Sequence, residues 1–104
     1  MKIMNGDRLV AYSVDNALGI PYKVVAVDSV EQNDLPLGLF GLKSREVNYL
    51  DFLDWVKTRC FPENRVDKDN CLRELGLDKY DALEIVRRTG ARMFYLDNIW
   101  VDWS

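Results

Sequence analysis

The stretch from Trp55 to Arg65 concentrates side chains that recognise other groups. It contains Trp55, the pair Phe61-Pro62 and two arginines, Arg59 and Arg65. Arginine binds carboxylates through a planar fork of donors and stacks on aromatic rings, and tryptophan is enriched at protein interfaces. These residue types favour recognition over catalysis. The two arginines also fit a structural role, pairing with carboxylates of the same domain or with carbonyl groups at helix ends, and the residues alone favour this second interpretation.

The sequence lacks the residue sets of the common catalytic and metal sites. It has no histidine, which removes His-based triads and most zinc sites, and its two cysteines are too few for a zinc cluster. The segment Gly38-Leu-Phe-Gly41 has neither the spacing nor the lysine of a phosphate-binding loop. Asp51 and Asp54 share a predicted helix face, but acid-base catalysis needs a desolvated carboxylate, and a solvated charged face explains them better. We therefore expect no enzymatic activity, no catalytic residue, no cofactor and no metal.

Length and charge narrow the class of protein. The 104 residues predict a single domain over residues 1–104. The net charge is −3, whereas a nucleic-acid surface needs an excess of Lys and Arg on one face, so we do not expect nucleic acid as a partner. The first residues lack the apolar stretch of a signal peptide, and no apolar run reaches the length of a membrane span. These patterns predict a cytoplasmic protein without membrane contact, in which Cys60 and Cys71 are reduced.

Strand patterns occur at both ends of the chain. Residues 2–4 and 8–12 flank Asn5-Gly6, a dipeptide typical of type I′ hairpin turns, and residues 22–28 are rich in β-branched side chains. Residues 92–96 and 99–103 predict a β-hairpin around Asp97-Asn98. The apolar loop over residues 32–44 is expected to be a connection packed on the core, with a binding loop as the alternative.

The middle of the chain has helical periodicity. The predicted helices run from Asn48 to before Pro62, over about residues 67–75, and over residues 78–89. Asn48 and Asp78 are the expected capping residues, and Gly90 suits the end of the third helix. The sequence therefore predicts an α+β fold with a small antiparallel N-terminal sheet, a central three-helix segment and a C-terminal β-hairpin.

The second and third predicted helices have the lengths of a helix-turn-helix, with the turn at Gly76-Leu77. A recognition helix offers polar or basic groups from its first turns, but this one carries Asp78, Asp81 and Glu84 there. A DNA-binding regulator is therefore kept only as a second alternative.

Five motifs occur in the order of a known bacterial module. They are Lys2-Ile-Met, Asp34-Leu-Pro-Leu-Gly38, Trp55-Val-Lys-Thr-Arg59 followed by Phe61-Pro62 and Arg65, Leu75-Gly-Leu77, and Asp97-Asn-Ile-Trp100-Val. Over nearly its whole length the chain resembles the N-terminal module that precedes the kinase domain in HipA-like proteins of clostridia and related bacteria. The sequence ends at Ser104, where the kinase would begin, so we expect no kinase activity.

The resemblance implies a freestanding, non-catalytic module. In three-gene relatives of the HipA system, a short protein similar to the missing part of the kinase acts as the antitoxin by binding the kinase. The leading hypothesis is therefore a protein-interaction module, an antitoxin-like or regulatory partner of a HipA-like kinase or another effector. Its predicted contact residues are Trp55, Arg59, Phe61, Arg65 and Trp100.

Other possibilities stay open. A small acidic protein from a mobile element could inhibit a host nuclease, in the manner of an anti-CRISPR protein, by occupying a basic groove. The contact set would then be Asp51, Asp54, Asp67, Asp69, Asp78, Asp81 and Glu84. We expect at least one of Trp55, Trp100 and Trp103 to face a partner or the second copy of a homodimer, and Tyr80, Phe94 and Tyr95 to extend that surface. An enzyme is the third class of protein that stays open, and it would need a deep polar pocket.

Overall fold

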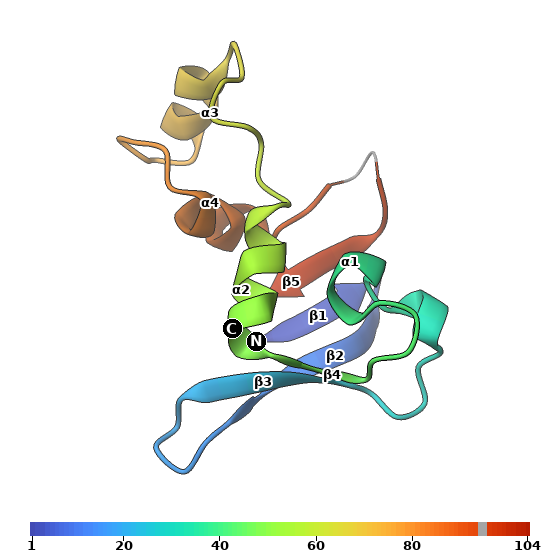
Figure 1. Cartoon of the computed structure of the whole chain (residues 1–104). Helices are drawn as coiled ribbons and strands as arrows, with labels where there is room; N and C mark the ends of the chain where they lie inside the picture. The colour runs from blue at the N-terminus through green and yellow to red at the C-terminus, as the bar shows by residue number, and fades with distance from the viewer. Residues whose placement is uncertain (94–95) are drawn as a thin grey trace.

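The computed structural model describes residues 1–93 and 96–104 and contains an antiparallel sheet of five strands in that part of the chain. The strands are β1 (Lys2–Asn5), β2 (Arg8–Asp15), β3 (Pro21–Ala26), β4 (Glu46–Asn48) and β5 (Ile99–Asp102). Their order across the sheet is β4-β3-β2-β1-β5, so the last strand lies beside the first (Figure 1). The predicted α+β fold is confirmed.

The helices cover one side of the sheet. They are the 3-10 turn η1 (Gln32–Asp34), α1 (Leu37–Phe40), α2 (Tyr49–Lys57), α3 (Lys68–Glu74) and α4 (Ala82–Thr89). Helix α2 packs on β3 and also contacts α1 and α4, whereas α3 projects away from the sheet (Figure 1). None of the helices in the described ranges has the length and apolar character needed to cross a bilayer.

Strand alternation explains the position of the core. Ile3, Ala11 and Val24 are fully buried and lie on the same face of the sheet, because Ile3 pairs with Ala11 and neighbouring strands place opposed residues on one face. Helix α2 presents Phe52 and Val56 to this face, both without exposed surface. The Phe52 ring lies between three other aromatic rings, with centroid distances of 5.4 Å to Tyr49, 6.1 Å to Trp55 and 5.7 Å to Trp103.

The N-terminal hairpin is confirmed, but its predicted turn is wrong. Asn5 pairs with Arg8, so the two turn residues are Gly6 and Asp7. Gly6 has φ +61°, and Asp7 is not among the residues with positive φ. A type I′ turn needs positive φ at both central residues, whereas glycine at the first central position with positive φ only there is typical of type II′. The asparagine therefore ends the strand instead of forming the turn.

The predicted C-terminal hairpin is also wrong. Strand β5 forms as expected, but it pairs with β1, with Ile3 opposite Val101. Arg92, Met93 and Leu96 are not in a strand, and Phe94 and Tyr95 lie outside the described residues. The other edge of β5 meets residue 90 instead, because the Val101 N–H donates to the Gly90 carbonyl at 2.7 Å. The free edge of β1 and the chain around Gly90 thus satisfy the backbone groups that a hairpin would have used.

The helix boundaries differ from prediction at two ends. Helix α2 begins after Asn48 as predicted but ends at Lys57, well before Pro62. Helix α4 begins at Ala82, because Asp81 and not Asp78 caps it: its carboxylate accepts the Glu84 N–H at 3.2 Å.

The apolar loop contains η1 and α1 and has two kinds of leucine. Leu35 and Phe40 are buried, as expected for a connection packed on the core. Leu37 and Leu42 are 63% and 79% exposed, which the packed-connection prediction did not foresee. The exposed pair keeps the binding-loop alternative open.

Substitution of Phe52 tests the position of the core. Phe52→Ala removes a fully buried ring and should lower the free energy of unfolding by about 3–5 kcal/mol in urea denaturation. The matched control is Leu50→Ala on the same helix, where the side chain is 73% exposed and the expected change is below about 0.5 kcal/mol. Equal losses in the two variants would mean that α2 does not pack on the sheet through this face.

Candidate interaction surfaces

The side chain of Arg59 joins the end of α2 to the chain around β5. It is 7% exposed. Its Nε donates to the Ala91 carbonyl at 2.7 Å, and its Nη2 donates to the Ile99 carbonyl at 3.0 Å. Nη1 and Nη2 also donate to the two carboxylate oxygens of Asp97, at 3.1 and 2.7 Å. The structural interpretation of Arg59 is confirmed. The expectation that Arg59 contacts a partner is wrong, because its own domain encloses the side chain and uses its donors.

Asp97 has its pKa set by the same contacts. Burial raises the pKa of the carboxyl group, but the hydrogen bonds from Arg59 and the Ile99 N–H, with the positive charge of Arg59, outweigh this effect. The pKa of Asp97 therefore lies below its ordinary value, and the carboxylate stays ionised beside the buried guanidinium.

The Trp55 side chain makes its contacts inside the domain. The guanidinium carbon of Arg59 lies over the Trp55 ring, 5.4 Å from its centre, in a cation–π contact. A Cβ atom added at Gly38 would lie 3.4 Å from the indole, so the ring is also close to α1. Trp55 is half-buried and packs against the hydrophobic core.

Phe61 and Tyr80 contact each other and so join the two ends of the segment that contains α3. Their rings meet edge to face at 5.8 Å, and the Tyr80 hydroxyl donates to the Phe61 carbonyl at 2.7 Å. The Cys60 thiol lies 3.3 Å from the same hydroxyl. Burial, with smaller contributions from Cys60 and Glu63, raises the pKa of Tyr80 to about 12, so the hydroxyl keeps its proton as a donor. Burial also raises the pKa of the Cys60 thiol, although its hydrogen bond with Tyr80 acts in the opposite direction.

Arg65 and Trp100 lie in different surroundings. Arg65 is exposed, pairs with Asp67, and has its guanidinium 5.8 Å from the Phe61 ring. The Trp100 indole donates to the Gly6 carbonyl at 2.8 Å, and the Arg92 guanidinium lies 4.2 Å from the centre of its ring. Of the five predicted contact residues, the structure therefore joins Trp55 to Arg59 and Phe61 to Arg65, and places Trp100 against β1 and Arg92.

The predicted acidic contact set is distributed over several parts of the molecule. Asp51 lines a hollow with Lys23, Glu46 and Asn48 beside β4, far along the chain from the members near α3. Three members serve local contacts: Asp67 with Arg65, Asp81 with the Glu84 N–H, and Glu84 with Arg88. The nuclease-inhibitor hypothesis stays a prediction.

The connection between α3 and α4 does not fit the helix-turn-helix alternative. Helix α3 ends at Glu74 and α4 begins at Ala82, so the connection is longer than the three or four residues typical of that motif. The Leu75 carbonyl accepts a hydrogen bond from Arg88 at 2.9 Å, which uses a basic group near the end of α4 inside the molecule.

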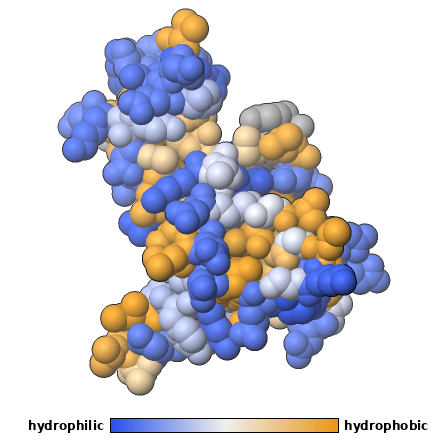
Figure 2. Space-filling model, viewed as in Figure 1, coloured by the Kyte–Doolittle hydropathy of each residue, from blue (hydrophilic) through white to orange (hydrophobic). Residues whose placement is uncertain are grey.

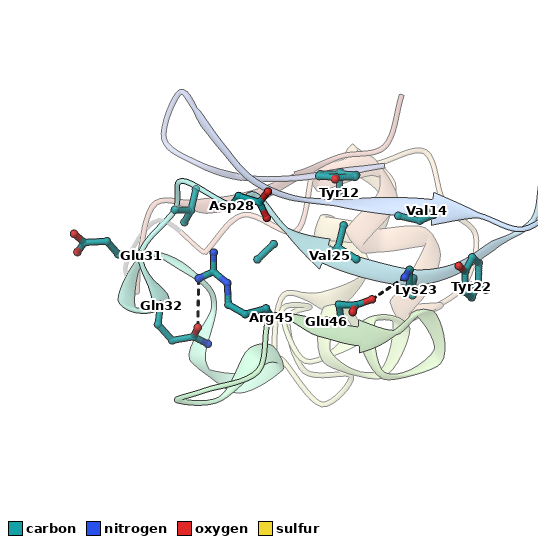
Figure 3. A pocket seen from close by; sticks show the side chains of 12 residues that line it. Tyr12, Val14, Tyr22, Lys23, Val25, Asp28, Glu31, Gln32, Arg45 and Glu46 are labelled. Carbon is teal, nitrogen blue, oxygen red and sulfur yellow. Dashed lines mark hydrogen bonds and ion pairs between the residues drawn. The ribbon is translucent and has the colours of Figure 1, made fainter.

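A groove on the open face of the sheet was not predicted. Tyr12 pairs with Val25 and Val14 with Lys23, so these four side chains share the face opposite the buried one. They line a hollow of about 700 Å³, with helical segments lying behind the strands (Figure 3). We call this hollow the sheet groove; its other lining residues are Tyr22, Ala26, Asp28, Val30, Glu31, Gln32, Arg45 and Glu46. Tyr12 is 41% exposed there and Tyr22 is 48% exposed.

The two basic residues of the sheet groove already have partners. Lys23 Nζ lies 2.7 Å from Glu46 Oε1, and this hydrogen bond raises the pKa of Lys23 (Figure 3). Arg45 donates to the Val27 carbonyl at 2.9 Å and to Gln32 Oε1 at 3.4 Å. The alternation of Tyr12, Val14, Lys23 and Val25 was readable in the sequence, but which face the helices would leave uncovered was not.

Comparison with known proteins found no match. The chain matches none of the family models, curated proteins or solved structures with which it was compared. Within residues 1–93 and 96–104, no three His, Cys, Asp or Glu side chains lie where they could share a metal ion.

The buried arginine gives a test with a matched control. Arg59→Met leaves the Asp97 carboxylate and the carbonyls of Ala91 and Ile99 without their donors. It should lower the free energy of unfolding by about 3 kcal/mol in urea denaturation. Arg65→Met changes an exposed arginine on the same segment and should cost far less. Similar losses in both variants would contradict the structural role of Arg59.

The lowered pKa of Asp97 predicts a pH dependence. A carboxyl group with a lower pKa in the folded than in the unfolded state stabilises the fold above the unfolded pKa, about 3.9, and loses this contribution as the pH falls through the folded pKa. The difference in unfolding free energy between the natural chain and Asp97→Asn should therefore be largest near neutral pH. It should shrink as the pH falls below about 4. A difference that stays constant over this range would show that Asp97 is not ionised beside Arg59.

Proposed function

We propose that this chain is a non-enzymatic protein-interaction module that binds its partner through the sheet groove. The observation that carries the proposal is the uncovered sheet face, where Tyr12 is 41% exposed beside a hollow of about 700 Å³ that Tyr22, 48% exposed, also lines. Tyrosine is among the residues that contribute most to protein binding, because its rigid ring buries a large area and its hydroxyl still finds a partner.

The composition of the groove supports a protein partner. Val14 and Val25 supply an apolar floor, while Lys23, Arg45 and Glu46 supply a charged rim. Protein interfaces have this arrangement of an apolar centre and a polar rim. The surface is wide and lies across strands β2, β3 and β4, which suits another protein surface (Figure 3).

The first partner to test is a HipA-like kinase. The motifs from Lys2 to Trp100 that resemble the module preceding such kinases support this choice. The contact residues differ from those predicted from the motif residues, since Arg59 is buried and Trp55 and Trp100 are partly used inside the domain. We further propose that the complex forms in the cytoplasm.

Affinity purification with variants of the groove tests the proposal. The tagged chain, Tyr12→Ala and Tyr12→Glu are expressed in a host that encodes a HipA-like kinase, and co-purified proteins are identified by mass spectrometry. The natural chain should recover the kinase, or another single effector, in stoichiometric amount. Tyr12→Ala should reduce the recovery about tenfold and Tyr12→Glu should abolish it, because the ring is an exposed aromatic side chain in the lining of the groove.

The control is Leu50→Glu, which adds the same charge at a side chain that is 73% exposed on α2. It should leave recovery unchanged. Circular dichroism and urea denaturation of each variant show that the fold is kept. Equal recovery by the Tyr12 variants and the natural chain, or loss in the Leu50 control, would count against the sheet groove as the binding surface.

A further inference from the structure

The segment between Phe61 and Tyr80 buries few side chains. We call residues 62–79 the arm; it contains α3 and projects away from the sheet (Figure 1). Leu72 is the one buried residue within the arm, and the surface over α3 is largely hydrophilic (Figure 2). Because burial of apolar surface is the main favourable term in folding, the arm adds little to the stability of the domain.

The arm also lies outside the hydrophobic core. Among the described residues, Leu72 on α3 and Ile85 on α4 are the buried apolar residues that do not belong to the core cluster around Phe52 and Val56. Helix α3 does not take part in the close packing that joins α2 to β3, α1 and α4. Few buried contacts are the mark of segments that open locally at a low free energy.

The rest of the domain is joined across the base of the arm. Arg59 precedes the arm in the chain, and its guanidinium donates to Ala91, Asp97 and Ile99, which all follow it. Helices α2 and α4, one before and one after the arm, also contact each other directly. These contacts do not involve the arm, so its movement leaves them intact.

Hydrogen bonds at two points hold the arm against the domain. At its base the Tyr80 hydroxyl donates to the Phe61 carbonyl at 2.7 Å, where the two rings meet. Farther out, Arg88 Nη1 on α4 donates to the Leu75 carbonyl at 2.9 Å. The net contribution of a single hydrogen bond is small compared with the free energy of unfolding of a whole domain.

From these features we infer that the arm opens as a unit, breaking the hydrogen bonds at Phe61 and Leu75, while the sheet, α2 and α4 stay folded. In the closed state Ile85 is 1% exposed and lines, with Phe61 and Arg65, a hollow of about 150 Å³. Opening carries Arg65 away from this hollow and gives access to Ile85. The arm is thus a lid over an apolar site on α4, and a molecule that binds the open state increases its population.

Hydrogen exchange of the full chain, followed residue by residue by NMR, tests the inference. The reporters are amides that donate within the arm: Cys71 N–H to Asp67, Leu75 N–H to Cys71 and Leu77 N–H to Leu72. They should exchange at least about a hundredfold faster than the slowest sheet amides. Urea below the unfolding transition should accelerate the reporters with one shared, shallow dependence, because opening exposes less surface than global unfolding does.

Variants separate opening of the arm from global unfolding. Ile3→Val trims a fully buried side chain in β1, and should accelerate the slowest sheet amides about two- to tenfold. It should leave the reporters unchanged, because the sheet stays folded when the arm opens. Tyr80→Phe and Arg88→Met each remove one hydrogen bond of the closed arm and should accelerate the reporters about two- to tenfold. Arg87→Met, which changes the neighbouring exposed arginine, should leave the reporters unchanged.

Two results would overturn the inference. If Ile3→Val accelerated the reporters as much as the slowest sheet amides, the arm would open only by global unfolding. If Tyr80→Phe and Arg88→Met left the reporters unchanged, these hydrogen bonds would not hold the arm closed. Neither result depends on the sheet groove, which other residues line, so the proposed function is tested separately.

Discussion

The structure depends on one buried cation, the guanidinium of Arg59. It donates at 2.7 to 3.1 Å to Asp97 and to the carbonyls of Ala91 and Ile99, which lie far along the chain from α2. A buried guanidinium is stable only when its donors are satisfied and a negative charge lies close, so these contacts fix where α2 ends relative to β5. Strand β5 in turn completes the sheet by pairing with β1. In the core, the Phe52 ring packs between the rings of Tyr49, Trp55 and Trp103.

This constraint separates the stabilising side of the molecule from the side that we propose for binding. Arg59, Trp55 and Trp100 were attractive as contact residues because Arg and Trp are common at interfaces, but inside this domain they hold the helices and the last strand to the sheet. On the opposite face of the sheet, no helix of the described residues covers Tyr12, Val14 and Val25. Because the helices pack on the other face, this is the surface that we propose for a partner.

The sequence predicted local structure better than long-range contacts. Strand propensity and alternation located β1, β2 and β3, and the period of apolar residues located α2, because both signals act over a few neighbouring residues. The pairing of β5 with β1 was missed, since nothing in a run of strand-forming residues says which distant strand it joins. For the same reason the role of Arg59 could be stated only as a choice between two interpretations, and its carboxylate partner Asp97 was assigned to a hairpin turn. The sheet groove could not be predicted at all, because it is defined by where helices are absent.

Site-specific photo-crosslinking in the native host tests the central claim most directly. The photoreactive residue p-benzoylphenylalanine replaces either Tyr12 in the sheet groove or Phe61 beside Arg65, both of which are aromatic positions with partly accessible rings. We expect a discrete covalent adduct with one partner protein from position 12 and none from position 61. An adduct from position 61 with none from position 12 would contradict the account, because it would return the binding surface to the Trp55–Arg65 stretch.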